Sequence, residues 1–279
     1  MYAITGITGH VGGAAARTLR AADQPVRAVV RNPDRGKEWS EFAVADLTDR
    51  AALTGAFAGC QGAFVLLPTV PPFTDAAHRE MADTIAGAVA DSRVPHVVVL
   101  SSYGADLADG TGPIRWLHHL ENRLRATGTR VTALRSPHFQ EKVETVLDAA
   151  TGAGVYPVFG ESADVPVPMV ATRDIGAAVA AALTSPPATS EVVDLEAPSY
   201  TERQVAEALG RVLGRDLTVV TIPRAGWLDT ITGTGVPPRL AEELVALYAA
   251  DEDGLLVPRG DRRQRCTTPI EETLREVAA

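Results

Sequence analysis

Short apolar runs alternate with helical patterns along the first half of the chain, and this alternation restricts the fold more than any other feature. Six runs have the length and composition of buried strands: Tyr2–Thr5, Pro25–Arg31, Phe42–Leu47, Gly62–Pro68, His96–Ser102 and Arg130–Ser136. Strands that are apolar on both faces occur in parallel sheets covered by helices on both sides. The sequence therefore predicts an α/β fold built on a doubly wound parallel sheet.

The pattern loosens after about residue 137. Residues 154–170 are rich in proline and glycine and predict a loop, whereas residues 224–258 predict a helical lobe. Between them, residues 191–197 resemble a late strand that returns to the main sheet. We expect residues 1–150 to form the main α/β domain and residues 151–279 to form mostly a smaller C-terminal α+β lobe.

The stretch TGITGHVGG, residues 5–13, follows the first predicted strand and precedes the first predicted helix. At such a turn the backbone N–H groups and the helix dipole favour a phosphate group. Gly6 would form the tight turn, Gly9 would let the backbone approach a pyrophosphate, and Gly12 would let the helix pack closely on the sheet. The spacing Gly-x-x-Gly-x-x-Gly also fits a glycine-rich turn without a ligand. In its context the stretch predicts dinucleotide binding, with Thr8, His10 and Val11 beside the glycines.

The residue at the end of the second predicted strand indicates which dinucleotide binds. NAD sites usually carry an acidic residue there, which accepts a hydrogen bond from the ribose 2′-hydroxyl. Here the position is Arg31, whose guanidinium can bind a 2′-phosphate, so we predict NADP(H). Asp46 and Leu47 close the third strand, where Asp46 could lie beside the adenine or could equally cap the next helix.

The bulk composition excludes several other classes of function. Lys and Arg total 26 against 35 Asp and Glu, a net charge of −9 that argues against nucleic acid as the main partner. No apolar run is long enough to cross a membrane, and no charged leader precedes the first strand. Cys60 and Cys266 form no disulfide or metal motif, so we expect reduced thiols, no metal and a cytoplasmic location.

Several segments together resemble the NmrA-like branch of the atypical short-chain dehydrogenases/reductases. They are TGITGHVGG, VRAVVRNPDR, VADLTD, AFVLLP, HVVVLSSYGA, GTRVTALRSPHFQE and ATRDIGAAVAAAL. The resemblance implies a Rossmann fold, NADP(H) binding and a C-terminal lobe that binds the substrate. It also implies one of several activities, because the family includes quinone-, azo- and isoflavone-type reductases as well as redox-sensing regulators without catalysis.

The resemblance also places residues around the nicotinamide. Leu67 and Pro68 would lie beside the nicotinamide ribose, and Ser101 and Ser102 would face the ring. Pro137, His138 and Phe139 would border the same ring, with His138 expected as a wall of the site rather than as a catalyst.

This chain lacks the Tyr-x-x-x-Lys pair that most of the superfamily uses to protonate the substrate. Its only lysines are Lys37 and Lys142. His118 and Glu121 are three residues apart on a predicted helix, so the carboxylate could hold the imidazole as a general acid. Both could equally flank a buried leucine stripe in solvent. Ser102 and Tyr103 are alternative proton donors.

We therefore predict a reductase that uses NADPH to transfer hydride to a quinone, enone, imine or ketone, acting as a monomer or homodimer. The alternatives are an NADP(H)-binding redox sensor and a non-redox isomerase or dehydratase. Four large side chains in the second half could line an apolar substrate pocket or could equally belong to the core: Tyr156, Phe159, Met169 and Trp227.

Overall fold

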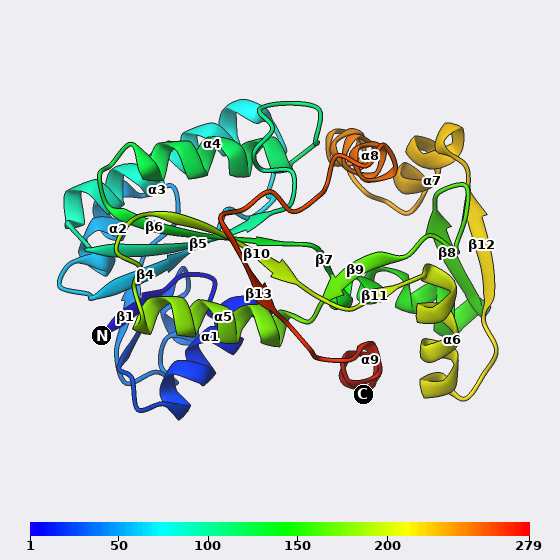
Figure 1. Ribbon diagram of the computed structural model, residues 1–279, viewed down its shortest axis with the longest axis horizontal. Helices are drawn as coiled ribbons and strands as arrows, with labels where there is room; N and C mark the ends of the chain where they lie inside the picture. The colour runs from blue at the N-terminus through cyan, green and yellow to red at the C-terminus, as the bar shows by residue number, and fades with distance from the viewer.

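The main sheet carries eight parallel strands in a computed structural model that describes residues 1–279 (Figure 1). Their order is β13-β10-β6-β5-β4-β1-β2-β3. The strands are β1 (Tyr2–Ile4), β2 (Val26–Val30), β3 (Phe42–Val44), β4 (Gly62–Val65), β5 (His96–Ser102), β6 (Arg130–Ser136), β10 (Glu191–Glu196) and β13 (Arg262–Arg265). The reversal at β1 puts β2 and β4 on either side of it, which confirms the predicted doubly wound sheet.

Helices cover both faces of this sheet, as the apolar strands require. Two of them, α1 (His10–Ala21) and α5 (Thr172–Thr184), pack together on one face. The other face carries α2 (Arg50–Phe57), α3 (Asp75–Ser92) and α4 (Ile114–Arg125). Each face has its own buried cluster of 23 residues, so the strands between the clusters are apolar on both sides.

The contact between α1 and α5 depends on a glycine. A Cβ atom on Gly176 of α5 would lie 2.4 Å from Cβ of Ala14 on α1. The two helices can approach this closely only because position 176 has no side chain and position 14 has a small one. The contact joins a helix from the second half of the chain to the first helix.

Two strands of the main sheet come from the second half of the chain. β10 pairs with β6, which confirms the predicted return of residues 191–197 to the sheet. β13 pairs with the far side of β10 and forms the sheet edge. The sequence does not predict β13, because its four residues, RRQR, have no apolar alternation.

The rest of the second half forms a lobe beyond the carboxyl edge of the sheet (Figure 1). It contains two small sheets, one of β7 (His138–Phe139), β9 (Val167–Val170) and β11 (Ser199–Tyr200), and one of β8 (Val155–Phe159) and β12 (Thr218–Ile222). Its helices are α6 (Glu202–Leu213), α7 (Trp227–Gly233), α8 (Pro238–Glu252) and α9 (Ile270–Val277). The prediction of a loop throughout residues 154–170 is wrong, since this segment supplies β8 and β9. Pro157 is accommodated because β8 lies at the edge of a two-stranded sheet.

Helix α8 holds the lobe against the loop that follows β5. A Cβ atom on Gly112 would lie 2.4 Å from the Glu243 carbonyl oxygen, so α8 rests directly on that backbone. Beside this contact, Arg115 of α4 donates two hydrogen bonds to the Glu243 carboxylate, one of them 2.7 Å long. The lobe is therefore fixed close to the ends of β5 and β6.

None of the helices combines the length and the apolar composition that crossing a lipid bilayer requires.

Candidate functional site

The glycine-rich turn between β1 and α1 has the geometry of an anion cradle. Gly6 has a positive φ of 60°, and a Cβ on Gly12 would lie 2.4 Å from the Gly6 carbonyl oxygen. A Cβ added at Gly9 would have open space around it, because the Gly6 carbonyl oxygen, 3.4 Å away, is the only atom within 4 Å. Gly9 is the N-cap residue, and no side chain caps the helix. The turn therefore presents open space and a helix N-terminus to a ligand, as a diphosphate requires.

The other predicted residues of this turn divide into two groups. Val11 is buried in the core, whereas Thr8 and His10 are exposed. The His10 imidazole lies 3.5 Å from the Glu144 carboxylate, in the short helix that follows β7. No signal in the sequence predicts that Glu144 lies beside this turn. The contact brings a segment that follows β7 to the N-terminus of α1.

Arg31 and Asp46 follow neighbouring strands, since Val30 of β2 pairs with Val44 of β3. Arg31 is exposed and makes no ion pair within the protein. Asp46 accepts hydrogen bonds from the backbone and hydroxyl of Thr48. These bonds, helped by the charge of Arg31, hold the pKa of Asp46 below its usual value. The alternative role of Asp46 as a helix cap is wrong, because Asp49 caps α2.

Four more residues predicted beside the nicotinamide lie after β4 and β6. Leu67 and Pro68 are half-buried directly after β4, and Leu67 packs against the core beneath α2 and α3. Pro137 is buried between β6 and β7, and the half-buried Phe139 packs against the core beneath α1 and α5. The carboxyl ends of parallel strands form one edge, so these residues share the edge that carries the glycine turn.

Ser101 and Glu121 belong to a buried polar network rather than to an exposed site. Ser101 Oγ donates to Glu121 Oε1 at 2.6 Å. Arg135 of β6 donates to both oxygens of the same carboxylate, at 3.0 and 2.8 Å. Glu121 is 1% exposed and Arg135 is 5% exposed. The network links β5, β6 and α4, and it engages the Ser101 hydroxyl, whose position beside the nicotinamide stays a prediction.

The predicted pairing of His118 with Glu121 is wrong. His118 Nδ1 lies 2.9 Å from the Ala105 carbonyl oxygen, and its Nε2 lies 2.9 Å from the Asn122 amide nitrogen. Both ring nitrogens therefore have partners, and neither is Glu121. The spacing of three residues did place the two side chains on adjacent parts of α4. However, Glu121 turns under the helix to meet Arg135, which sequence spacing alone does not reveal.

Tyr103 is held away from solvent by a backbone partner. Its hydroxyl donates to the Leu195 carbonyl oxygen at 2.6 Å, and its side chain is buried. Burial, with the nearby charge of Asp194, raises the pKa of Tyr103 to about 12. The phenol thus joins β10 to the end of β5, and it is poorly suited to donate a proton near neutral pH.

Ser102 and His138 keep polar atoms free at the same edge. The Ser102 backbone pairs with Ser136, two residues before His138. The Ser102 hydroxyl is half-exposed and makes no hydrogen bond within the protein. His138 Nε2 lies 3.1 Å from Asp251 Oδ2 of α8, at an angle that departs from an ideal hydrogen bond. Nothing in the sequence signalled this contact, because Asp251 lies in a distant helix.

Three of the four predicted pocket residues are core residues instead. Met169 and Trp227 are fully buried, and the Trp227 indole donates to the Ile222 carbonyl oxygen. Tyr156 is 2% exposed and donates to Glu202, and burial raises its pKa. Only Phe159 remains half-buried, with its ring centroid 5.3 Å from that of Tyr248.

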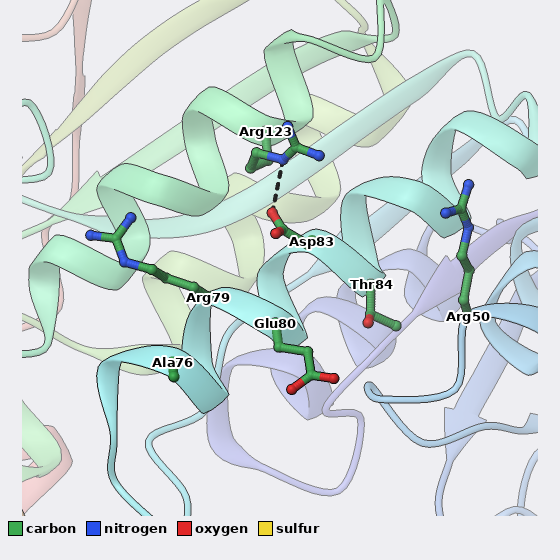
Figure 2. Close-up of a pocket in the computed structure, with 7 residues that line it drawn as sticks. All are labelled: Arg50, Ala76, Arg79, Glu80, Asp83, Thr84 and Arg123. Atoms are coloured by element: carbon green, nitrogen blue, oxygen red, sulfur yellow. Dashed lines mark ion pairs between the residues drawn. The ribbon is translucent and has the colours of Figure 1, made fainter.

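A polar depression of about 440 Å³ lies elsewhere, on the outer surface of α2, α3 and α4 (Figure 2). Three arginines line it, but each has an acidic partner. Arg50 pairs with Asp91, Arg79 with Asp75 and Arg123 with Asp83, at 2.7, 2.6 and 2.8 Å. With its cations neutralised, the depression lacks the free charge of an anion site.

Known NAD(P)H-dependent reductases are similar to this chain in sequence and in fold. The model of the NmrA-like family matches residues 2–262. An NAD(P)H azoreductase of Xenophilus azovorans is 27% identical over 255 residues, covering 89% of this chain and 86% of the relative. An NADPH-dependent quinone oxidoreductase of Escherichia coli, solved with NADPH, has a TM-score of 0.81 and 22% identity over 100% of both chains. A triphenylmethane reductase of Citrobacter sp., solved with NADP(H), has a TM-score of 0.79 and 21% identity over 99% of this chain and 100% of that one.

Proposed function

Because the chain belongs to the NmrA-like family, we propose that it is an NADP(H)-dependent oxidoreductase that reduces a small electrophilic molecule. The observation that carries the proposal is the uncapped N-terminus of α1 behind the open Gly9 position. The azoreductase relative, which aligns with most of the chain, supports the same class of reaction.

The residues present fit the parts of an NADP(H) molecule. The turn at Gly6, Gly9 and Gly12 would hold the diphosphate through backbone N–H groups. Arg31 would bind the 2′-phosphate, since its guanidinium is exposed and makes no direct ion pair. Leu67, Pro68 and Ser102 would border the nicotinamide end. When bound, the cofactor supplies a hydride, and the chain's own residues orient the acceptor beside it.

The absence of a tyrosine–lysine pair at the site favours one class of acceptor. No tyrosine–lysine pair stands at the edge of the sheet, and the Tyr103 hydroxyl is engaged by Leu195. Electron-poor acceptors such as quinones, enones, imines and azo compounds need less help from a protein acid than simple ketones do. We therefore propose these as the substrates.

Replacing Arg31 by alanine is expected to weaken NADPH binding by about 1–3 kcal/mol, because a charge-assisted contact to the 2′-phosphate is lost. NADH has no 2′-phosphate, so its affinity should change little. Isothermal titration of both cofactors measures the difference. Arg203→Ala, at an exposed arginine of α6, is the matched control and should alter neither affinity. Equal losses for NADPH and NADH would contradict the role of Arg31.

A screen of acceptors tests the proposal as a whole. NADPH oxidation is followed at 340 nm with a quinone, an azo dye, an enone and a ketone. Turnover of any of them supports the reductase. Tight binding of NADPH and NADP⁺ without turnover would instead indicate a redox sensor, and failure to bind either cofactor would contradict the proposal.

A further inference from the structure

The buried contacts of the site remove most of the expected proton donors. The Tyr103 hydroxyl donates a hydrogen bond to a backbone carbonyl, His118 has both ring nitrogens occupied, and Glu121 is enclosed by Ser101 and Arg135. Reduction of a neutral acceptor nevertheless requires a proton as well as a hydride. A side chain with a free donor at the ends of β5 and β6 would meet that need.

His138 has the required free atom. It follows the end of β6 directly after Pro137, and its backbone pairs with Met169 in the small sheet. Its Nε2 faces Asp251, while its Nδ1 makes no hydrogen bond and is not enclosed by protein atoms. The side chain is 25% exposed. A protonated His138 could thus keep Nε2 on the carboxylate and present Nδ1–H to a bound molecule.

Asp251 is suited to hold a protonated imidazole. Burial raises the pKa of Asp251, but contact with His138 and the nearby charge of Lys142 outweigh burial and hold the pKa below its usual value. Lys142 is itself paired with Glu202, which also accepts from Tyr156. The carboxylate of Asp251 therefore stays ionised near neutral pH and can accept a hydrogen bond from the imidazole Nε2.

We propose that His138 donates the proton in the reduction and that Asp251, from α8, is its positioning residue. The inference rests on the proposed function. With an azo acceptor, one nitrogen of the N=N bond takes the hydride and the other takes the Nδ1 proton, giving a hydrazine. NADPH is oxidised to NADP⁺, and the neutral imidazole regains its proton from water. With a quinone, the same two transfers give a hydroquinone.

Acceptors that need no proton separate this role from a structural one. A cationic triarylmethane dye such as crystal violet becomes neutral when its central carbon accepts a hydride. Replacing His138 by glutamine should therefore lower kcat for an azo dye about 100-fold, the size of a lost general acid. The loss of kcat for crystal violet should be at least about tenfold smaller, because that reduction consumes no proton. His119→Gln is the matched control, because His119 also contacts a carboxylate, Asp83, but on the outer surface.

A second comparison of the two dyes tests Asp251. Asp251→Asn should lower kcat for the azo dye more than kcat for crystal violet, because without the carboxylate Nε2 is no longer held and the Nδ1–H donor loses its orientation. A purely structural role for Asp251 would reduce kcat equally for both dyes.

Two measurements without turnover complete the test. Replacing His138 by glutamine should move the titration of the Asp251 carboxyl carbon, followed by ¹³C NMR, to higher pH. Fluorescence titration with NADPH gives the cofactor affinity of each protein, so that the two kcat values are compared at saturating NADPH. Equal losses with the azo dye and crystal violet, or no loss with either, would overturn the role of His138 while leaving the reductase intact. Absence of any turnover by the wild type would overturn both proposals.

Discussion

Replacing Gly9 by valine is expected to abolish detectable NADPH binding while the protein remains folded. The open position in front of α1 would be filled by two methyl groups, which would keep a diphosphate from the backbone N–H groups. Losing two such charge-assisted bonds costs about 3 kcal/mol or more, roughly 100-fold in affinity. The measurement is a fluorescence titration with NADPH, beside a urea unfolding curve for each protein.

The structure explains why this substitution should remove NADPH binding without unfolding the protein. The added Cβ would lie 3.4 Å from the Gly6 carbonyl oxygen, an ordinary contact, so the unfolding free energy should fall by only about 1 kcal/mol through a weaker N-cap. Gly12→Ala offers a contrast, because its Cβ would lie 2.4 Å from that oxygen and should destabilise the fold itself. Gly55→Val, on an open part of α2, is the matched control. Retention of NADPH affinity within tenfold in Gly9→Val would rule out the cradle.

Replacing Glu121 by alanine is expected to lower the free energy of unfolding by about 3 kcal/mol or more, because the buried Arg135 guanidinium loses its main partner. The Ser101 hydroxyl loses its acceptor in the same step. Urea unfolding followed by circular dichroism gives the value. This effect should be the largest of any single ion-pair replacement described for this chain.

An exposed ion pair supplies the control for that experiment. Arg203 and Asp164 form a two-bond contact like that of Arg135 and Glu121, but both side chains are about half-exposed. Asp164→Asn should therefore cost less than about 1 kcal/mol. Replacing both members of the buried pair, Glu121→Leu with Arg135→Met, should recover part of the loss, since neither charge of that pair is left buried alone. Equal losses for Glu121→Ala and Asp164→Asn would contradict the importance of burial.

The main sheet and the glycine turn could be predicted because their signals are local. Apolar residues dominate β4 and the first part of β5, and Gly6, Gly9 and Gly12 recur at every third position across the turn and the start of α1. The strand β13 has no apolar run that would mark it in the sequence. It is held by backbone pairing with β10 and by the contact of Arg262 with Glu191, which depend on the assembled sheet.

The lobe and the proton donor were harder to predict for the same reason. In β8, Tyr156 and Val158 are buried while Val155, Pro157 and Phe159 are less so, an alternation that the proline obscured in the sequence. The contact between His138 and Asp251 forms only when α8 lies over the end of β6. The direction of Glu121 likewise depends on Arg135, a residue of a neighbouring strand.

The order of the strands along the chain sets the order in which the sheet can be completed during synthesis. β13 follows every other strand of this sequence, yet it pairs beside β10 in the sheet that begins with Tyr2. All of the lobe except α9 is made before it. Domains generally fold as units as they emerge, but here one flank of β10 stays unpaired until residues 262–265 have been made.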